Sequence, residues 1–315
     1  MIVYRALSDV PNDGRSVVTI GMFDGVHRAH QAILRMVVSK AKELGGRSVV
    51  VTFEPHPREV VTKDKKVELL STLDERMELF ERHGVDAVLL IPFTYEFSRL
   101  PFLEFYQRYI IDGIGVAGVV EGFNHQFGRD REAGMNQVQD LGRKHGFFVE
   151  TIPMMKEGEA VISSTTIRNL LSDGAIPLAN AIIGSPYRFT GTVVRGHGRG
   201  KKLGYPTANI RLSDHRKLVP KIGVYAVRIL VRGTWYGGMM SIGYNPTFDD
   251  VREKTIEVNI FDFDMDIYDD TVTVRCVERT RNEMKFASVD ELIAEMGRDK
   301  VRTTEILKNT THNQH

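Results

Sequence analysis

The first part of the chain alternates short apolar runs with segments whose apolar residues recur every three or four positions. The apolar runs are rich in Val and Ile and predict strands over residues 16–21, 48–53, 86–91, 116–121 and 147–152. The segments between them predict helices over residues 33–44, 74–83, 101–111 and 135–145. Continuous apolar strands that alternate with helices predict a doubly wound parallel sheet, covered on both faces. Such sheets bind ligands where the carboxyl ends of strands meet the amino ends of helices.

The pattern changes after about residue 184. From there on, runs of period two or rich in β-branched residues are separated by Gly, Pro and Asp, and they cover residues 187–194, 224–231, 235–242, 255–261 and 271–277. Runs with this spacing predict an antiparallel barrel or sandwich. A helical pattern over residues 288–307 and a polar tail follow.

The length of the chain and this change of pattern predict two domains. A chain of 315 residues exceeds the size that one hydrophobic core usually serves. The join near residues 183–186 is short, so we place the domains at residues 1–183 and 184–315. The predicted fold class is therefore α/β plus β, with a doubly wound parallel sheet first and an antiparallel β domain second.

Composition and charge limit the classes of partner. Apolar residues make up 42% and charged residues 26%, as in ordinary globular proteins, and the formal net charge is +1. This balance argues against non-specific binding to nucleic acid or to a membrane surface. Cys276 is the single cysteine, which excludes an intrachain disulfide and a multi-cysteine metal site. With no signal-like N-terminus and no apolar run of the ~20 residues that cross a membrane, we expect a cytoplasmic protein.

Residues 19–31 carry candidate chemistry between the first strand and the first helix. Gly21 and Gly25 permit close approach of the backbone to a ligand, and His27 and His30 face the same side of a starting helix. A helix N-terminus favours phosphate, and two imidazoles there can stabilise charge as pyrophosphate leaves. The residues alone leave two other interpretations open. One is a pair of surface histidines at a helix cap, and the other is a zinc site that lacks Cys or HExxH partners.

A second helix start, at residues 162–168, also offers phosphate-binding groups. Ser163 or Ser164 can cap this helix, while Thr165 and Arg168 lie near its first turn. An ordinary capping motif has the same pattern except for Arg168.

Residues 191–209, GTVVRGHGRGKKLGYPTAN, form the most specific stretch of the chain. Glycines alternate with basic residues in its middle, at Gly196, His197, Gly198, Arg199, Gly200, Lys201 and Lys202. A flexible loop with many N–H groups and positive charge suits a polyphosphate. The spacing differs from the GxxxxGK[ST] of a P-loop. A nucleic-acid loop is the alternative, and the neutral chain without an aromatic stacking platform makes it the weaker one.

These motifs resemble those of prokaryotic bifunctional riboflavin kinase/FAD synthetases, over roughly residues 15–305. Four motifs of the nucleotidylyltransferase domain occur in the family's order: GMFDGVHRAH at 21–30, TFEPHP at 52–57, GFNHQFG at 122–128 and ISSTTIR at 162–168. The resemblance implies His27 and His30 as catalytic residues. It also implies an ATP- and phosphate-binding set consisting of Gly21, Phe23, Asp24, Asn124, Ser164, Thr165 and Arg168.

The sequence departs from the family's usual pattern in two places. Ala29 stands where many members have Gly between the two histidines, and a small residue is compatible with a helix there. Residues 124–126, Asn-His-Gln, stand where an Asp-Phe-Arg-like triplet is usual, which removes a carboxylate and a basic group.

The glycine-rich stretch resembles the riboflavin kinase motif that ends in PTAN. The resemblance implies a six-stranded antiparallel barrel with terminal helices, in which Thr207 and Asn209 bind Mg²⁺ with ATP, and Glu257 is the catalytic base. By position alone, a Glu on a barrel strand is more often a solvated outward residue. The implied ATP-binding set consists of Gly196, Gly198, Arg199, Gly200, Lys201, Pro206 and Thr207. Arg281 and Phe286 are the implied flavin contacts.

The resemblance implies ATP-dependent phosphorylation of riboflavin to FMN, followed by adenylyl transfer from ATP to FMN, which gives FAD and pyrophosphate. The implied partners are riboflavin, FMN, FAD and ATP with Mg²⁺, with no nucleic acid or membrane, for a monomer or weak homo-oligomer. Two alternatives are a kinase whose first domain has degenerated at residues 124–126, and a flavin-binding module without turnover. A nucleotidylyltransferase for another substrate, such as a pantetheine phosphate, would leave PTAN unexplained.

Overall fold

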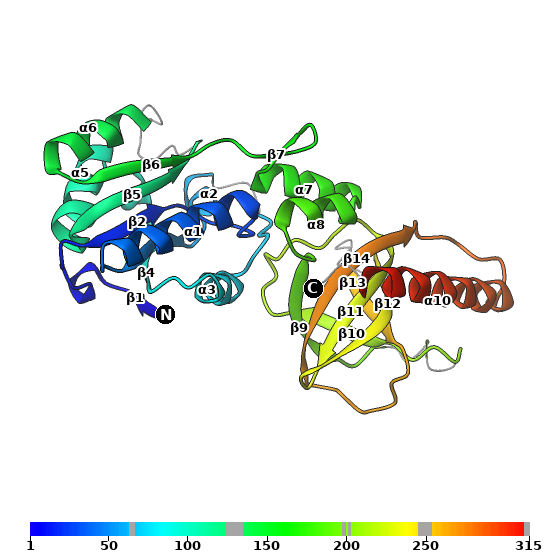
Figure 1. Ribbon diagram of the computed structural model, residues 1–315. Helices are drawn as coiled ribbons and strands as arrows, with labels where there is room; N and C mark the ends of the chain where they lie inside the picture. The colour runs from blue at the N-terminus through cyan, green and yellow to red at the C-terminus, as the bar shows by residue number, and fades with distance from the viewer. Residues whose placement is uncertain (63–66, 124–134, 197–199, 201–202, 245–253, 312–315) are drawn as a thin grey trace. The chain divides into compact units, whose positions relative to one another are not determined.

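The structure is a computed structural model, and it describes residues 1–62, 67–123, 135–196, 200, 203–244 and 254–311. The chain divides into two compact units, Met1–Ser164 and Thr165–His315. Figure 1 labels their helices and strands.

The first unit is built on a six-stranded sheet in which every neighbouring pair is parallel. Its strands, in the order in which they lie, are β1 (Ile2–Tyr4), β4 (Ala87–Pro92), β3 (Ser48–Glu54), β2 (Ser16–Ile20), β5 (Val116–Gly122) and β6 (Phe148–Ile152). The chain moves from β2 outward through β3 to β4, and then crosses to β5 on the other side of β2. The switch point between β2 and β5 is where sheets of this kind bind ligands.

Helices cover both faces of this sheet, as the apolar strands predict. The helical segments are η1 (Leu7–Asp9), α1 (Arg28–Glu43), α2 (Pro57–Val61), α3 (Leu73–Arg82), α4 (Tyr95–Ser98), α5 (Phe102–Phe105), η2 (Tyr106–Ile114) and α6 (Met135–His145). One core joins α1 and α3 to the sheet, with Leu34 and Phe80 fully buried. The other joins α5, η2 and α6 to the opposite face, with Phe105 and Ile110 fully buried. The predicted doubly wound sheet is confirmed.

The predicted helix over residues 101–111 is wrong in its form. The structure has a short α5 that continues as a π-helix, η2, to Ile114, and Gly115 ends it in the left-handed region at φ 75°. Periodicity cannot separate a π-helix from an α-helix over nine residues, because both place apolar residues on one face. The edge strand β1 and a small hairpin, β7 (Lys156–Glu157) with β8 (Ala160–Val161), are also absent from the sequence prediction.

The second unit contains a closed barrel of six antiparallel strands. Around the barrel they are β10 (Ala208–Leu212), β13 (Lys254–Ile260), β12 (Thr234–Tyr244), β11 (Gly223–Val231), β14 (Thr271–Arg281) and β9 (Arg188–Val194). This confirms the barrel. Five strands follow the period-2 runs, whereas β10 begins within PTAN at Ala208 and was not predicted.

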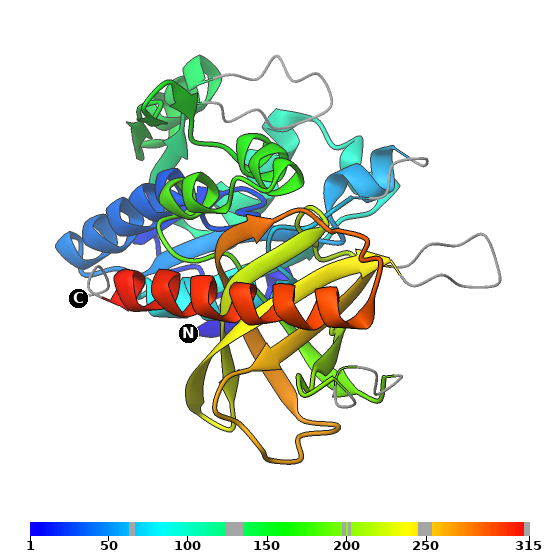
Figure 2. The ribbon, with the colours of Figure 1, turned by 90° about the vertical axis from the view of Figure 1, so that its right-hand side faces the viewer.

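Helices accompany the barrel. Helix α7 (Ser164–Asp173) and α8 (Ile176–Ile183) precede it, and the Asn180 amide of α8 donates to the Cys276 carbonyl of β14 at 2.9 Å. Helix α10 (Val289–Thr311) runs across the barrel strands, as Figure 2 shows. Leu307 packs against Ala226 and Val277 there, and Arg228 donates to the Leu307 carbonyl at 3.0 Å. Over the described residues, no helix is both long and apolar enough to span a membrane.

Candidate active sites

The loop between β2 and α1 is forced into an uncommon backbone shape. Phe23 and Val26 have φ of 52° and 37°, in the left-handed region that side chains other than glycine rarely adopt. Both side chains are nevertheless buried, at 2% and 1% exposure. Gly25 lies between them at φ 84°, where any added Cβ would meet Leu70 at 3.0 Å. The loop therefore delivers the chain to the amino end of α1 in one fixed conformation.

His27 and His30 lie together at that helix end. His27 is the N-cap residue of α1, and its Nδ1 accepts from the backbone N–H of His30 at 3.4 Å. The two rings stack, with centroids 3.7 Å apart and planes 15° from parallel. An imidazole that accepts at Nδ1 carries its proton on Nε2 when neutral, so His27 has a donor for a ligand. The Nδ1 of His30 is buried and has no hydrogen-bond partner in the described part of the chain.

Burial keeps both imidazoles neutral. It lowers the pKa of His27 from 6.5 to about 4, against the opposing influence of the Asp24 carboxylate. Burial also lowers the pKa of His30 well below 6.5, and the neighbouring His27 lowers it further. A neutral imidazole keeps one N–H, so it can still donate a hydrogen bond to a phosphate at the helix N-terminus.

This burial predicts an acid-sensitive stability. Between pH 6.5 and about 4, His27 binds a proton in the unfolded chain and not in the folded one, so acidification favours unfolding. The free energy of unfolding is unaffected by His27 above pH 6.5, and it decreases by about 1.4 kcal/mol for each pH unit below 6.5, down to about pH 4. Urea unfolding between pH 7 and pH 5 should show this dependence, and it should be shallower in His27→Asn, which keeps a capping oxygen. His145→Asn changes an exposed histidine of the same unit, and an equal effect there would contradict the prediction.

Asp24 fixes the middle of the loop between β2 and α1. Its carboxylate is 3% exposed and accepts from the backbone N–H groups of Leu70 and Ser71, at 3.0 and 2.9 Å. The Ser71 hydroxyl in turn accepts from the Gly25 N–H at 2.8 Å. Asp24 thus joins the loop to the segment that leads into α3, a task that the sequence did not indicate. A contact of Asp24 with ATP stays a prediction.

Two other residues of the first predicted set, Phe23 and Ser164, contact this loop or its histidines. Phe23 packs against His30, with ring centroids 5.0 Å apart, and Gly21 lies against Phe23. Ser164 begins α7 and donates its hydroxyl to the Asp24 carbonyl at 2.9 Å. Thr165 and Arg168 follow in the first turns of the same helix. Asn124 lies outside the described residues.

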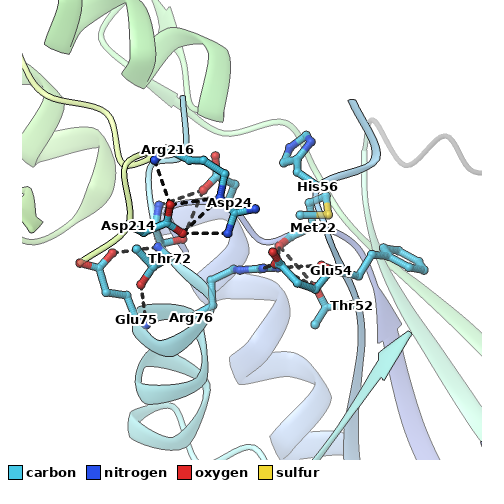
Figure 3. A network of polar contacts seen from close by, with 12 residues as sticks. Met22, Asp24, Thr52, Glu54, His56, Thr72, Glu75, Arg76, Asp214 and Arg216 are labelled. Carbon is cyan, nitrogen blue, oxygen red and sulfur yellow. Dashed lines mark hydrogen bonds and ion pairs between the residues drawn. The ribbon is translucent and has the colours of Figure 1, made fainter. Parts of the chain in front are cut away.

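Arg76 is a residue of this site that sequence analysis missed. Figure 3 shows it reaching from α3 toward Met22, Thr52 and Glu54. Its side chain is 1% exposed, and the guanidinium lies 2.7 Å from the Glu54 carboxylate. No motif contains it, because a lone Arg on a helix gives no signal of burial.

In the second unit, the PTAN segment meets strand β13. The Thr207 hydroxyl donates to the Glu257 carboxylate at 3.1 Å. Asn209 lies directly opposite Glu257 in the register of β10 and β13. The fold therefore brings three of the predicted residues together, although Thr207 and Glu257 are 50 positions apart in the chain.

Two glycines make room beside these oxygens. A Cβ on Gly196 would lie 2.2 Å from the amide nitrogen of Asn209, and one on Gly200 would lie 2.4 Å from the Tyr205 carbonyl oxygen. The glycine-rich stretch is therefore closely packed on PTAN where the structure describes it. Gly198, Arg199 and Lys201 lie outside the described residues.

Asn259 is a second residue that the sequence did not single out. It is 6% exposed, and its amide donates to the Pro206 carbonyl at 2.7 Å. Strand β13 thus contacts two consecutive residues of the PTAN segment. Asn259 bonds to Pro206, and Glu257 bonds to Thr207. A signal was present, since positions two apart on a strand share a face.

Arg281 and Phe286 also come together, though the arginine has a second partner. The guanidinium lies 5.9 Å from the centre of the Phe286 ring. It also pairs with Asp299 of α10, with Nη2 2.7 Å from Oδ2, and Asp299 is 4% exposed. This pair joins the end of β14 to α10, and a flavin contact of either residue stays a prediction.

A family model described as FAD synthetase matches residues 9–166, and one described as riboflavin kinase matches residues 183–307. A bifunctional riboflavin kinase/FMN adenylyltransferase from Listeria monocytogenes is 37% identical over 297 residues, which cover 94% of each chain.

This chain belongs to the bifunctional riboflavin kinase/FMN adenylyltransferase family.

Further members of the family are similar over almost the whole chain. The Bacillus subtilis protein is 35% identical over 94% of this chain and 93% of its own. The Escherichia coli protein is 35% identical over 95% of both. A solved structure from Streptococcus pneumoniae, which bears the name macrolide-efflux protein, has a TM-score of 0.88 and 34% identity, and covers 96% of this chain and 98% of that one. The likeness therefore extends over both units.

The donor set in the second unit fits a hard divalent cation. Thr207 and Asn209 offer neutral oxygens, and Glu257 adds a carboxylate beside Thr207. Because the Thr207 hydroxyl uses its proton on Glu257, its lone pairs stay free to coordinate a cation. Among the described residues, no group of three or more His, Cys, Asp and Glu side chains could hold a metal ion.

Proposed function

We propose that this chain phosphorylates riboflavin to FMN with ATP and then transfers the adenylyl group of a second ATP to FMN. The observation that carries the proposal is the meeting of Thr207, Asn209 and Glu257, because this places a base beside cation ligands on one barrel wall. The buried pair His27 and His30 at the amino end of α1 supports the second activity.

In the kinase reaction, Glu257 accepts the proton of the riboflavin 5′-hydroxyl while the oxygen attacks the γ-phosphorus of ATP and ADP leaves. Glu257 is half-buried, and its hydrogen bond with Thr207 orients the carboxylate. Gly196 and Gly200, with the remainder of the glycine-rich loop, hold the ATP phosphates. Asn259 keeps Pro206 and Thr207 in register with the base.

Thr207 and Asn209 would hold Mg²⁺ together with ATP. When bound, the ion would supply neutralisation of the phosphate charge, as in other kinases. Because the two protein ligands are neutral, most of its charge is left for the phosphates.

Replacing Gly196 with alanine tests this metal assignment. The new Cβ would overlap the Asn209 side chain, whose end must move, while the barrel stays intact. We expect the apparent affinity of the kinase for Mg²⁺ to fall about 10-fold, with recovery at high Mg²⁺. Gly297→Ala is the matched control, because its Cβ would have ordinary contact distances. Unchanged Mg²⁺ dependence in Gly196→Ala would argue against Asn209 as a ligand.

In the adenylyl transfer, the FMN phosphate attacks the α-phosphorus of ATP and pyrophosphate leaves. Because FMN supplies the nucleophile, the enzyme needs only to position the reactants and stabilise charge. His27 donates from Nε2, and His30 presents a second imidazole beside it. Ser164, Thr165 and Arg168 at the start of α7 supply further phosphate contacts.

We assign adenylyl transfer to residues 1–183 and the kinase to residues 184–315, supported by the family-model matches to 9–166 and 183–307. The enzyme is proposed to act in the cytoplasm, supported by its single, buried cysteine, which suits a reducing compartment. We propose a monomer or weak homo-oligomer.

The proposal is tested by incubating the full chain with riboflavin and Mg-ATP and separating the flavins by chromatography. FMN should form first and FAD later. FMN without FAD would restrict the function to the kinase. No product, with flavin bound, would instead indicate a binding module.

A further inference from the structure

Arg76 is a buried cation that no motif of the family resemblance includes. It lies on α3, and its Nη1 donates to the Met22 carbonyl and to the Thr52 hydroxyl, both at 3.1 Å. Its Nη2 donates to the Glu54 carboxylate at 2.7 Å (Figure 3). A buried charge is unfavourable unless its donors are satisfied. The hydrogen bonds of Arg76 satisfy its donors, and its side chain is therefore tolerated at 1% exposure.

The partners of Arg76 all lie at the carboxyl edge of the sheet. Thr52 and Glu54 belong to the end of β3, and Met22 belongs to the loop after β2. The Thr52 hydroxyl also donates to the Met22 carbonyl, at 3.4 Å. Arg76 therefore ties the beginning of the β2–α1 loop to the neighbouring strand.

That loop depends on such ties for its shape. Phe23 and Val26 have positive φ, and a backbone of this kind persists only where its surroundings fix it. Arg76 fixes the loop at Met22, and Leu70 and Ser71 fix it at Asp24. Both ties come from α3 or from the segment that leads into it. The next residues of the chain after Val26 are His27 and the first turn of α1.

We propose that Arg76 is a positioning residue for adenylyl transfer, which holds the β2–α1 loop so that His27 and His30 face the reacting phosphates. The proposal rests on the proposed function of the first unit. A guanidinium is required, because its planar fork donates to a carbonyl, a hydroxyl and a carboxylate at once. A lysine ammonium can pair with Glu54 but cannot reproduce this geometry.

The competing role is purely structural, as a buried ion pair that stabilises the unit. The two roles separate in kinetics. Loss of stability lowers the folded fraction, and its effect disappears when the enzyme is cooled well below its unfolding midpoint. A displaced loop lowers the turnover of folded enzyme at every temperature and affects kcat more than KM, because the loop acts on charge that develops during the reaction.

The experiment compares Arg76→Lys with the unaltered full chain, measuring FAD formation from FMN and ATP and FMN formation from riboflavin. Ser48→Ala is the matched control. It removes a buried hydroxyl that bonds Asp86 at 2.7 Å, at the opposite end of the same strand β3. We expect Arg76→Lys to lower the kcat of FAD formation at least about 10-fold, with KM for FMN nearly unchanged and kinase turnover unaffected. The deficit should persist on cooling, and Ser48→Ala should show none.

A second variant decides the matter if Arg76→Lys does not fold. Thr52→Val keeps the size of the side chain and removes the hydroxyl that joins Arg76 to Met22, so it should lower the same kcat to a smaller extent. Unchanged FAD turnover in the folded variants would overturn the proposal. So would a deficit that disappears on cooling, or an equal deficit in Ser48→Ala. If the unaltered chain makes no FAD, the proposed function fails instead.

Discussion

Replacing Glu257 with glutamine is expected to lower kinase turnover by about 10²–10⁴-fold, the usual contribution of a general base. Glutamine keeps an acceptor oxygen for the Thr207 hydroxyl, so PTAN should stay in place while basicity at this position is lost. The measurement is the rate of FMN formation from riboflavin and ATP at saturating Mg²⁺. In the same preparation, FAD formation from added FMN should be unchanged, because the adenylyl transfer is assigned to the other unit.

A matched control distinguishes the base from a general effect of losing a charge on the barrel. Glu278 lies on β14, is also half-buried, and contacts neither PTAN nor β13 in the strand register. Glu278→Gln should therefore keep full kinase turnover. Equal loss of both activities in Glu257→Gln, or full retention of the kinase, would remove Glu257 from the proposed mechanism.

The second large effect is expected from the two stacked histidines. Combining His27→Asn with His30→Ala should lower FAD formation by at least about 10³-fold, since a single preorganised donor to developing charge contributes about 10²–10³-fold. Asparagine at position 27 retains an oxygen for the N-cap, so α1 should still begin at Arg28. FMN formation from riboflavin serves as the internal reference and should be unaffected.

The control for this pair removes two other histidines of the same unit. His83 follows α3 and His145 ends α6, and neither is close to α1 in sequence. His83→Ala with His145→Ala should leave FAD formation intact. An unaffected FAD yield in the His27 and His30 double variant would contradict the proposed adenylyl-transfer site.

The sequence predicted the sites that depend on local spacing and left out those that depend on distant partners. The three-residue spacing of His27 and His30 was enough to place them on one side of a helix start. Arg76 gave no such signal, because its acceptors are Met22, Thr52 and Glu54 on other elements. Asn259 shares a strand face with Glu257, but its contact with Pro206 exists only because the chain brings PTAN beside β13.

The same distinction applies to the fold. Period-2 runs identified five of the six barrel strands, but β10 begins with the last two residues of PTAN and has no such run. The π-helix after α5 also escaped prediction, since its amphipathic pattern resembles that of an α-helix. Asp24, implied as a nucleotide contact, bonds to Leu70 and Ser71 in the structure.

By itself, the sequence determined the two fold classes and indicated candidate functional residues, because strand and helix periods and short motifs are local properties. Only the tertiary structure decided that Thr207, Asn209 and Glu257 meet, and that Arg76 and Asp24 hold the loop before His27. Such contacts join residues tens of positions apart. Their partners are set by strand order and register, which no local pattern specifies.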